Sequence, residues 1–157
     1  MSDYFSAQFD RLLRLAICAD AWLGTPYVVS GAVRGSGASC HCLAAAVLSD
    51  AGWRFPPPPP RGLTRLREYT ASMRAWLDSL PEYFAPIPLT HPLLPDTLQP
   101  GDVLLCELGC GHIALYLGGP DAEALQVLRH TPAHVVSLHD PQVPAHILAA
   151  YRPQEAL

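Results

Sequence analysis

The chain has 157 residues, of which 50% are hydrophobic and 15% charged, so it is long enough for one domain and too apolar for a disordered protein. Ten basic against fourteen acidic residues leave a net charge of -4, which argues against a nucleic-acid-binding surface. No uncharged run approaches the roughly 20 residues of a membrane span, and the first residues show no secretory signal. We therefore expect a single domain over residues 1–157.

The first half of the chain predicts three helices. Apolar residues recur at helical spacing over Phe9–Leu23, and a glycine-rich loop at 31–37 leads into a second helical pattern over His41–Ala51. A run of prolines at 56–60 must be extended, because it offers no backbone donors. The pattern over Leu63–Leu80 then predicts a third amphipathic helix.

The second half predicts β-strands. The proline-rich stretch 85–100 is expected to be a connector, and short apolar runs separated by Gly, Pro or Asp follow it. Five strands are expected: Val103–Leu105, Ile113–Leu117, Leu125–Leu128, His134–Leu138 and Ile147–Tyr151. Helices followed by a meander of strands predict an α+β domain, with N-terminal helices packed on a C-terminal antiparallel sheet of about five strands.

Cys40 is the first candidate functional residue. It lies between the glycine-rich loop and the predicted start of the second helix. The N–H groups at a helix start have no partner within the helix, so they favour a thiolate and can stabilise an oxyanion. A thiol also needs an imidazole nearby to become a good nucleophile at neutral pH. Position alone leaves open that Cys40 is simply a small buried residue.

Two histidines could supply that imidazole and its support. His112 opens a predicted strand and shares one face with Ala114 and Tyr116, away from the purely aliphatic face. His130 ends the run 125–130, which could form the neighbouring strand and hold the first imidazole in one tautomer. The alternative for His112 is an exposed histidine at a strand end.

Three blocks of sequence, in this order, resemble the signature of the NlpC family, which are papain-like cysteine peptidases of bacterial cell walls. The blocks are Leu23–Tyr27 before the glycine-rich loop, Cys40–Gly52, and Gln99–Val103 followed by His112–Gly118. The likeness spans about residues 15–135, and three ordered blocks are more specific than any one of them. The proline-rich middle segment resembles the branch of the family found in phage tails.

The resemblance implies a papain-like fold and hydrolysis of amide bonds in peptidoglycan stem peptides. It implies Cys40 as nucleophile, His112 as base and His130 as the third residue of the triad, with no cofactor. Tyr27 is the position carried over as an oxyanion donor beside the Cys40 N–H. Ser39 and His41 join the substrate and oxyanion candidates, because they flank the nucleophile where the family usually has Asp and a small residue.

The same resemblance bears on partners and location. It implies peptidoglycan peptides as the substrate, with phage-tail or envelope proteins as further partners. Because no secretory signal is visible, we expect a cytoplasmic or phage-particle location.

Two other functions remain open at this stage. One is a catalytically inactive docking module of a phage tail or envelope, because Ser39 and His41 depart from the family pattern. The other is a zinc site built from Cys40, Cys106, Cys110 and His112. Helix geometry opposes zinc, since Cys40 and Cys42 would point about 200° apart on the second helix.

Overall fold

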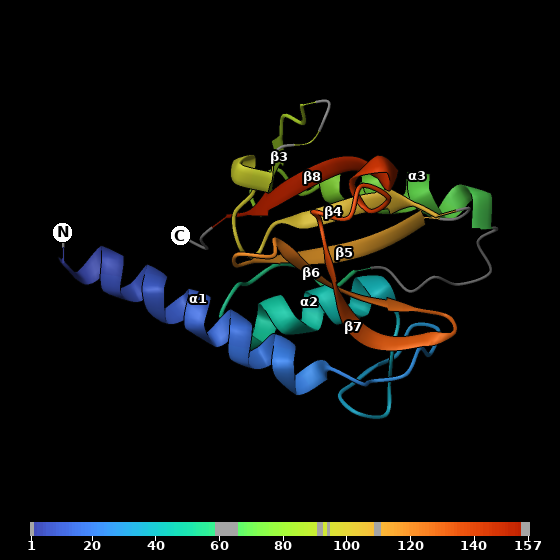
Figure 1. The fold of residues 1–157 in the computed structure, drawn as a ribbon, viewed down its shortest axis with the longest axis horizontal. Coiled ribbons are helices and arrows are strands. Elements are labelled where there is room, and N and C mark those ends of the chain that lie inside the picture. Colours follow the sequence, from blue (N-terminus) through green and yellow to red (C-terminus); the bar gives the residue numbers. More distant parts are fainter. Residues whose placement is uncertain (1, 59–65, 91–92, 94, 109–110, 155–157) are drawn as a thin grey trace.

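The structure, a computed structural model, places the helices before most of the strands (Figure 1). It describes residues 2–58, 66–90, 93, 95–108 and 111–154. The helices and strands are α1 (Ser2–Trp22), β1 (Ala32–Val33), β2 (Gly37–Ala38), α2 (Cys40–Asp50), α3 (Leu66–Asp78), β3 (Phe84–Ile87), β4 (Val103–Glu107), β5 (Gly111–Gly118), β6 (Glu123–Leu128), β7 (Thr131–Ser137) and β8 (Ile147–Pro153). Two short 3₁₀ turns lie at Pro95–Thr97 and Pro144–His146.

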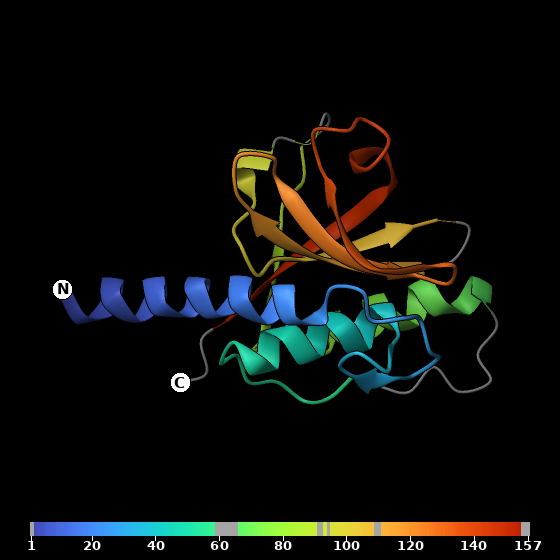
Figure 2. The ribbon, with the colours of Figure 1, turned by 60° about the horizontal axis from the view of Figure 1, so that its bottom comes forward.

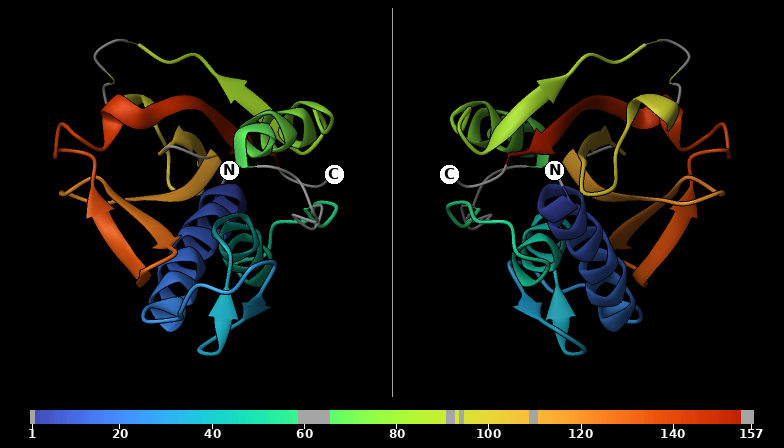
Figure 3. Two further views of the ribbon diagram at one scale, coloured as in Figure 1. Left: turned by 90° about the vertical axis from the view of Figure 1, so that its right-hand side faces the viewer. Right: turned by 90° about the vertical axis from the view of Figure 1, so that its left-hand side faces the viewer.

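The main sheet has six strands in the order β3-β8-β4-β5-β6-β7, and every neighbouring pair is antiparallel. The sheet curls strongly, so that β7 turns back toward the helices (Figure 3). Helices α1 and α2 pack side by side beneath the sheet, and α2 contacts β5 and β6 (Figure 2). Helix α3 contacts β4 and β5. This layering is the α+β arrangement that the sequence predicts.

Two apolar clusters occupy the two faces of the sheet. Along β5, Ile113 and Leu115 join the cluster that holds the helices, whereas Ala114 and Tyr116 join a cluster on the opposite face. The alternation follows from the two-residue period of a strand. Because both faces of β5 are covered, its residues are almost all buried.

The predicted helices and the predicted antiparallel sheet are confirmed, with differences at two places. The main sheet gains a sixth strand, β3, inside the stretch predicted to be a connector, so the connector prediction for its first residues was wrong. Pro86 within β3 is tolerated because β3 lies at the edge of the sheet. The glycine-rich loop also contains a short hairpin, β1–β2, that the sequence did not indicate.

The third predicted helix is shorter in the structure than in the sequence pattern. It starts at Leu66, and Leu63 lies outside the described residues. Among the described helices, none combines the length and the apolar character that crossing a bilayer would require.

Candidate functional site

Cys40 is the first residue of α2, and hydrogen bonds hold the backbone of the residue before it. Ser39 is extended, with φ -89° and ψ 164°; its N–H donates to the Gly31 carbonyl at 3.1 Å and its carbonyl accepts from Leu43 N–H at 2.8 Å. The Ser39 hydroxyl does not cap the helix and instead lies 3.4 Å from Nδ1 of His41. The Cys40 side chain is 7% exposed. The thiol is therefore held at a helix N-terminus, where the helix dipole favours a thiolate.

The loop before Cys40 is held by close packing. The buried hydroxyl of Thr25 accepts a hydrogen bond from the Gly35 N–H at 3.0 Å. Gly37 passes so close to Val28 that an added Cβ would lie 2.3 Å from its Cγ2. Only glycine fits there without moving the loop, so the glycine-rich composition sets the path of the chain into Cys40.

Tyr27 lies beside that same path. It forms an isolated parallel bridge with Ala38, two residues before Cys40, and its side chain is partly buried against the helix-side cluster. The structure therefore brings the Tyr27 backbone near the start of α2.

Cys106 is the cross-strand neighbour of His112. On the β4–β5 pair, Cys106 and His112 are direct partners in the register, and both side chains are buried. Burial, with a smaller contribution from the nearby Cys40, raises the pKa of the Cys106 thiol to about 12. Cys40 is therefore an electrostatic neighbour of Cys106, which pairs with His112 in the register of β4 and β5.

The imidazole of His112 is buried and hydrogen-bonded. Its Nε2 lies 2.8 Å from Oε1 of Gln126 on β6. Burial lowers the pKa of His112, the hydrogen bond to Gln126 opposes this, and the positive charge that His134 can carry lowers it again. The ring is therefore neutral at neutral pH. Because an amide oxygen only accepts, Nε2 carries the hydrogen and Nδ1 has the free lone pair.

A cavity of about 230 Å³ opens beside His112 on the sheet face opposite the helices. His112 and Gln126 supply polar atoms to its wall, and apolar side chains such as Leu104 and Ile147 line much of the remainder. Asp140 also borders it, from the segment after β7. A mostly apolar pocket with a few converging polar groups is typical of a ligand site.

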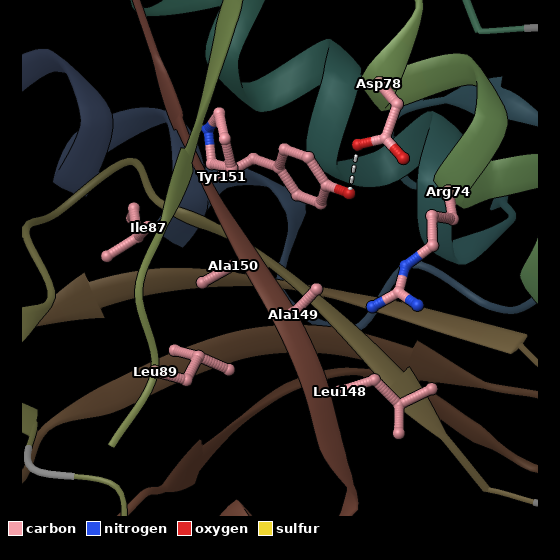
Figure 4. A pocket seen from close by; sticks show the side chains of 9 residues that line it. Arg74, Asp78, Ile87, Leu89, Leu148, Ala149, Ala150 and Tyr151 are labelled. Carbon is pink, nitrogen blue, oxygen red and sulfur yellow. Dashed lines mark hydrogen bonds between the residues drawn. The ribbon is translucent and has the colours of Figure 1, made fainter.

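A second, larger hollow lies elsewhere, between α3 and the β3–β8 edge (Figure 4). Its volume is about 500 Å³, and Arg74 and Asp78 project into it from α3. The Tyr151 hydroxyl donates to Oδ1 of Asp78 at 2.7 Å, and burial is the main cause that raises the pKa of Tyr151 to about 12. None of the predicted site residues lines this hollow.

The structure does not give His130 the predicted orienting contact. Strand β6 ends at Leu128, so His130 lies in the turn before β7 and is exposed, while Gln126 takes the hydrogen bond on the His112 ring. Gln126 is therefore the orienting residue that this geometry supports. Sequence reasoning missed it, although it is the one polar side chain in the predicted strand Leu125–Leu128.

His41 points elsewhere than to the His112 cavity. It is 1% exposed and packs between α2, α3 and the sheet, where it lines a small void with Trp76 and Phe84. Its side chain therefore has a packing environment, and the predicted substrate contact is not supported by this placement.

The zinc alternative loses its geometric basis among the described residues. Within that part of the chain, no three His, Cys, Asp or Glu side chains gather as a metal site needs. Cys110, which the alternative also requires, lies outside the described residues.

Comparison with known proteins places the fold. No protein-family model matches the chain, and no curated protein matches it. The solved structure of an NLP/P60-family protein, similar to a lipoprotein, from Staphylococcus aureus superposes with a TM-score of 0.59 at 18% identity over 93% of this chain. An NlpC/P60-family protein from Bacillus cereus gives 0.55 at 17% identity over 88%.

The resemblance seen in the sequence is therefore confirmed at the level of the fold. The chain has the α+β fold of NlpC/P60 proteins, although it spans only 42% and 39% of the lengths of those two.

Proposed function

We propose that this chain is a cysteine hydrolase that cleaves an amide bond in bacterial cell-wall peptides, with Cys40 as nucleophile and His112 as base. The observation that carries the proposal is the buried, neutral His112, held through Nε2 by Gln126. Its register partner Cys106 lies within electrostatic range of Cys40 at the start of α2. The likeness of the fold to NlpC/P60 proteins supports the substrate class.

The proposed reaction uses these groups in order. The reaction requires the Cys40 thiol, at the start of α2, to come within hydrogen-bond reach of Nδ1 of His112. Nδ1 then takes the thiol proton, and the sulfur attacks the amide carbonyl carbon. The oxyanion is stabilised by the N–H groups at the start of α2, with Tyr27 as the candidate second donor. His112 returns its proton to the leaving amine, which leaves a thioester on Cys40. Water, deprotonated by His112, then releases the carboxylic acid and restores the thiol.

The lowered pKa of His112 suits this role. A neutral imidazole can accept a proton at neutral pH, whereas an imidazolium cannot. Gln126 holds the ring so that one nitrogen is fixed as the base, which is the part played by the third residue of a catalytic triad.

The test is a digest of purified peptidoglycan and of synthetic stem peptides by the wild type, Cys40→Ala and Cys42→Ala. Cys42 is half-buried and lies two residues further along the same helix, so it is a matched control. We expect new amine termini from the wild type and from Cys42→Ala, and none from Cys40→Ala. Equal activity in all three proteins would exclude Cys40 as the nucleophile.

One observation favours a second candidate, a docking module of a phage tail or envelope. Phe9, Leu13 and Ile17 recur at four-residue steps on α1 and are 66%, 51% and 60% exposed. The N-terminal part of α1 extends beyond the sheet (Figure 1). An exposed apolar stripe of this kind marks a protein-contact surface.

Thiol alkylation separates the two candidates. The hydrolase proposal expects Cys40 to react with iodoacetamide well below pH 8.5, the ordinary pKa of a thiol, and faster than the half-buried Cys42. Labelling of both thiols that rises together only above that pH would favour the docking module.

A further inference from the structure

We propose that His134 is a positioning residue, which locks the amide of Gln126 and thereby fixes the neutral tautomer of His112. The three side chains form one hydrogen-bonded chain that starts at a backbone carbonyl and ends at the base. The inference about the tautomer stands on this geometry alone, whereas its effect on catalysis rests on the proposed function.

The chain of hydrogen bonds begins at Pro132. Nδ1 of His134 lies 2.8 Å from the Pro132 carbonyl oxygen, which can only accept. Nδ1 of His134 must therefore carry a hydrogen. In a neutral imidazole the other nitrogen then has no hydrogen, so Nε2 of His134 is an acceptor.

That acceptor decides the orientation of Gln126. Nε2 of His134 lies 3.1 Å from the amide nitrogen of Gln126, which donates to it. The amide oxygen is then turned toward His112, 2.8 Å from its Nε2. Because the oxygen only accepts, His112 must carry its hydrogen on Nε2, and Nδ1 is left as the basic nitrogen. The reverse orientation of Gln126 would need a doubly protonated His134.

The backbone holds His134 in place for this role. Gln126 and His134 are direct register partners on β6 and β7. The preceding residue, Ala133, donates to the Thr25 carbonyl and accepts from the Gly24 N–H, both at 2.8 Å. Strand β7 is thus tied to the segment that leads into the glycine-rich loop. The same segment therefore helps to position both Cys40 and the support of His112.

The decisive measurement is the tautomer of His112, read from ¹⁵N chemical shifts of labelled histidines at pH 8, where ordinary histidines are neutral. We expect the Nε2–H form in the wild type and a mixture of both tautomers in His134→Ala. His139→Ala is the matched control, because the His139 ring also bonds a proline carbonyl, that of Pro120 at 3.1 Å, and shares no hydrogen bond with Gln126. An unchanged Nε2–H form in His134→Ala would overturn the proposal.

A double variant distinguishes a specific role of His134 from a general disruption of the site. In Gln126→Glu the carboxylate can accept from Nε2–H of His112 through either oxygen, so His134 is no longer needed to choose the acceptor. We expect Gln126→Glu/His134→Ala to keep the Nε2–H form that His134→Ala loses. A mixture of tautomers in both variants would show that His134 acts by general disruption and would contradict the proposal.

The kinetic consequence uses the same variants. We expect His134→Ala to lower kcat by about 3- to 10-fold with little change in KM, the net value of one hydrogen bond. His139→Ala should leave both constants unchanged. A wild type without activity would refute the proposed function while leaving the tautomer result valid. An active His134→Ala with unchanged kcat would overturn the catalytic part of the inference.

Discussion

Two polar clusters lie at opposite ends of the β4–β5 hairpin, and they are built on different principles. At one end, the buried Asp102 accepts from Nε and Nη2 of Arg152 at 3.0 and 2.9 Å and from the Gln99 N–H at 2.7 Å. At the other end, the neutral side chains of His112 and Gln126 form a chain with His134.

The difference separates a structural cluster from a chemical one. Both carboxylate oxygens of Asp102 accept hydrogen bonds, and the bond from Arg152 to Asp102 raises the pKa of Arg152, so the guanidinium keeps its charge. His112 has a pKa lowered by burial and keeps one ring nitrogen unprotonated. A saturated ion pair holds strands together, whereas a neutral imidazole with a fixed tautomer can exchange a proton.

Replacing His112 should remove activity and leave the fold. In His112→Gln we expect a loss of turnover of about 10³-fold or more, because the general base is lost. The free energy of unfolding should change little, since a neutral polar side chain replaces another. Kinetic assays with stem peptides and urea denaturation measure the two quantities. Near-wild-type turnover would show that the His112 cluster is structural as well.

Replacing Asp102 should have the opposite pattern. Asp102→Asn removes the charged acceptor of Arg152, so we expect the free energy of unfolding to fall by about 2 to 3 kcal/mol. Because Arg152 is partly exposed, water offsets some of the loss. Turnover at a temperature where the variant is folded should stay within about twofold of the wild type, the scatter expected of a site with no contact to the reacting groups. A loss of kcat in Asp102→Asn without a matching loss of stability would contradict the assignment of Asp102 and Arg152 to a purely structural cluster.

A milder change at the same cluster should show that its geometry matters. Arg152→Lys keeps the charge and loses the two-pronged contact with Asp102, so we expect about 1 kcal/mol of destabilisation. Chemical denaturation in low and high salt measures it. No difference between Lys and Arg would mean that charge alone, without the paired hydrogen bonds, accounts for the contribution.

Acidification should produce a small loss of stability that depends on His112. The folded pKa of His112 lies below its ordinary value of 6.5, so the unfolded chain binds a proton more readily in the window between the two values. The contribution of His112 to stability is complete above about pH 6.5 and is lost as the pH falls through the folded pKa. We expect Tm to fall more in the wild type than in His112→Gln on acidification. Parallel Tm curves would contradict the depressed pKa.

Much of the candidate site could be predicted from the sequence, because its signals are local. A glycine-rich loop before a helical pattern places Cys40 at a helix start, and strand alternation puts His112 on the face away from Ile113. The orienting residue could not be predicted in the same way. His130 and Gln126 belong to the same run, 125–130, and only the point where β6 ends decides which of them contacts His112.

Local sequence signals were sufficient for the order of the three main helices and the last five strands, and for Cys40 and His112 at the starts of their elements, since periodicity and turn residues act over a few positions. They did not indicate β3 or the β1–β2 hairpin. The contacts between distant segments appear only once the chain is folded. Arg152 meets Asp102 across 50 residues, and Gln126 turns its amide oxygen to His112 because His134 holds the other side. Such pairings depend on strand register and on the hydrogen-bonding capacity of each partner, neither of which can be read from local composition.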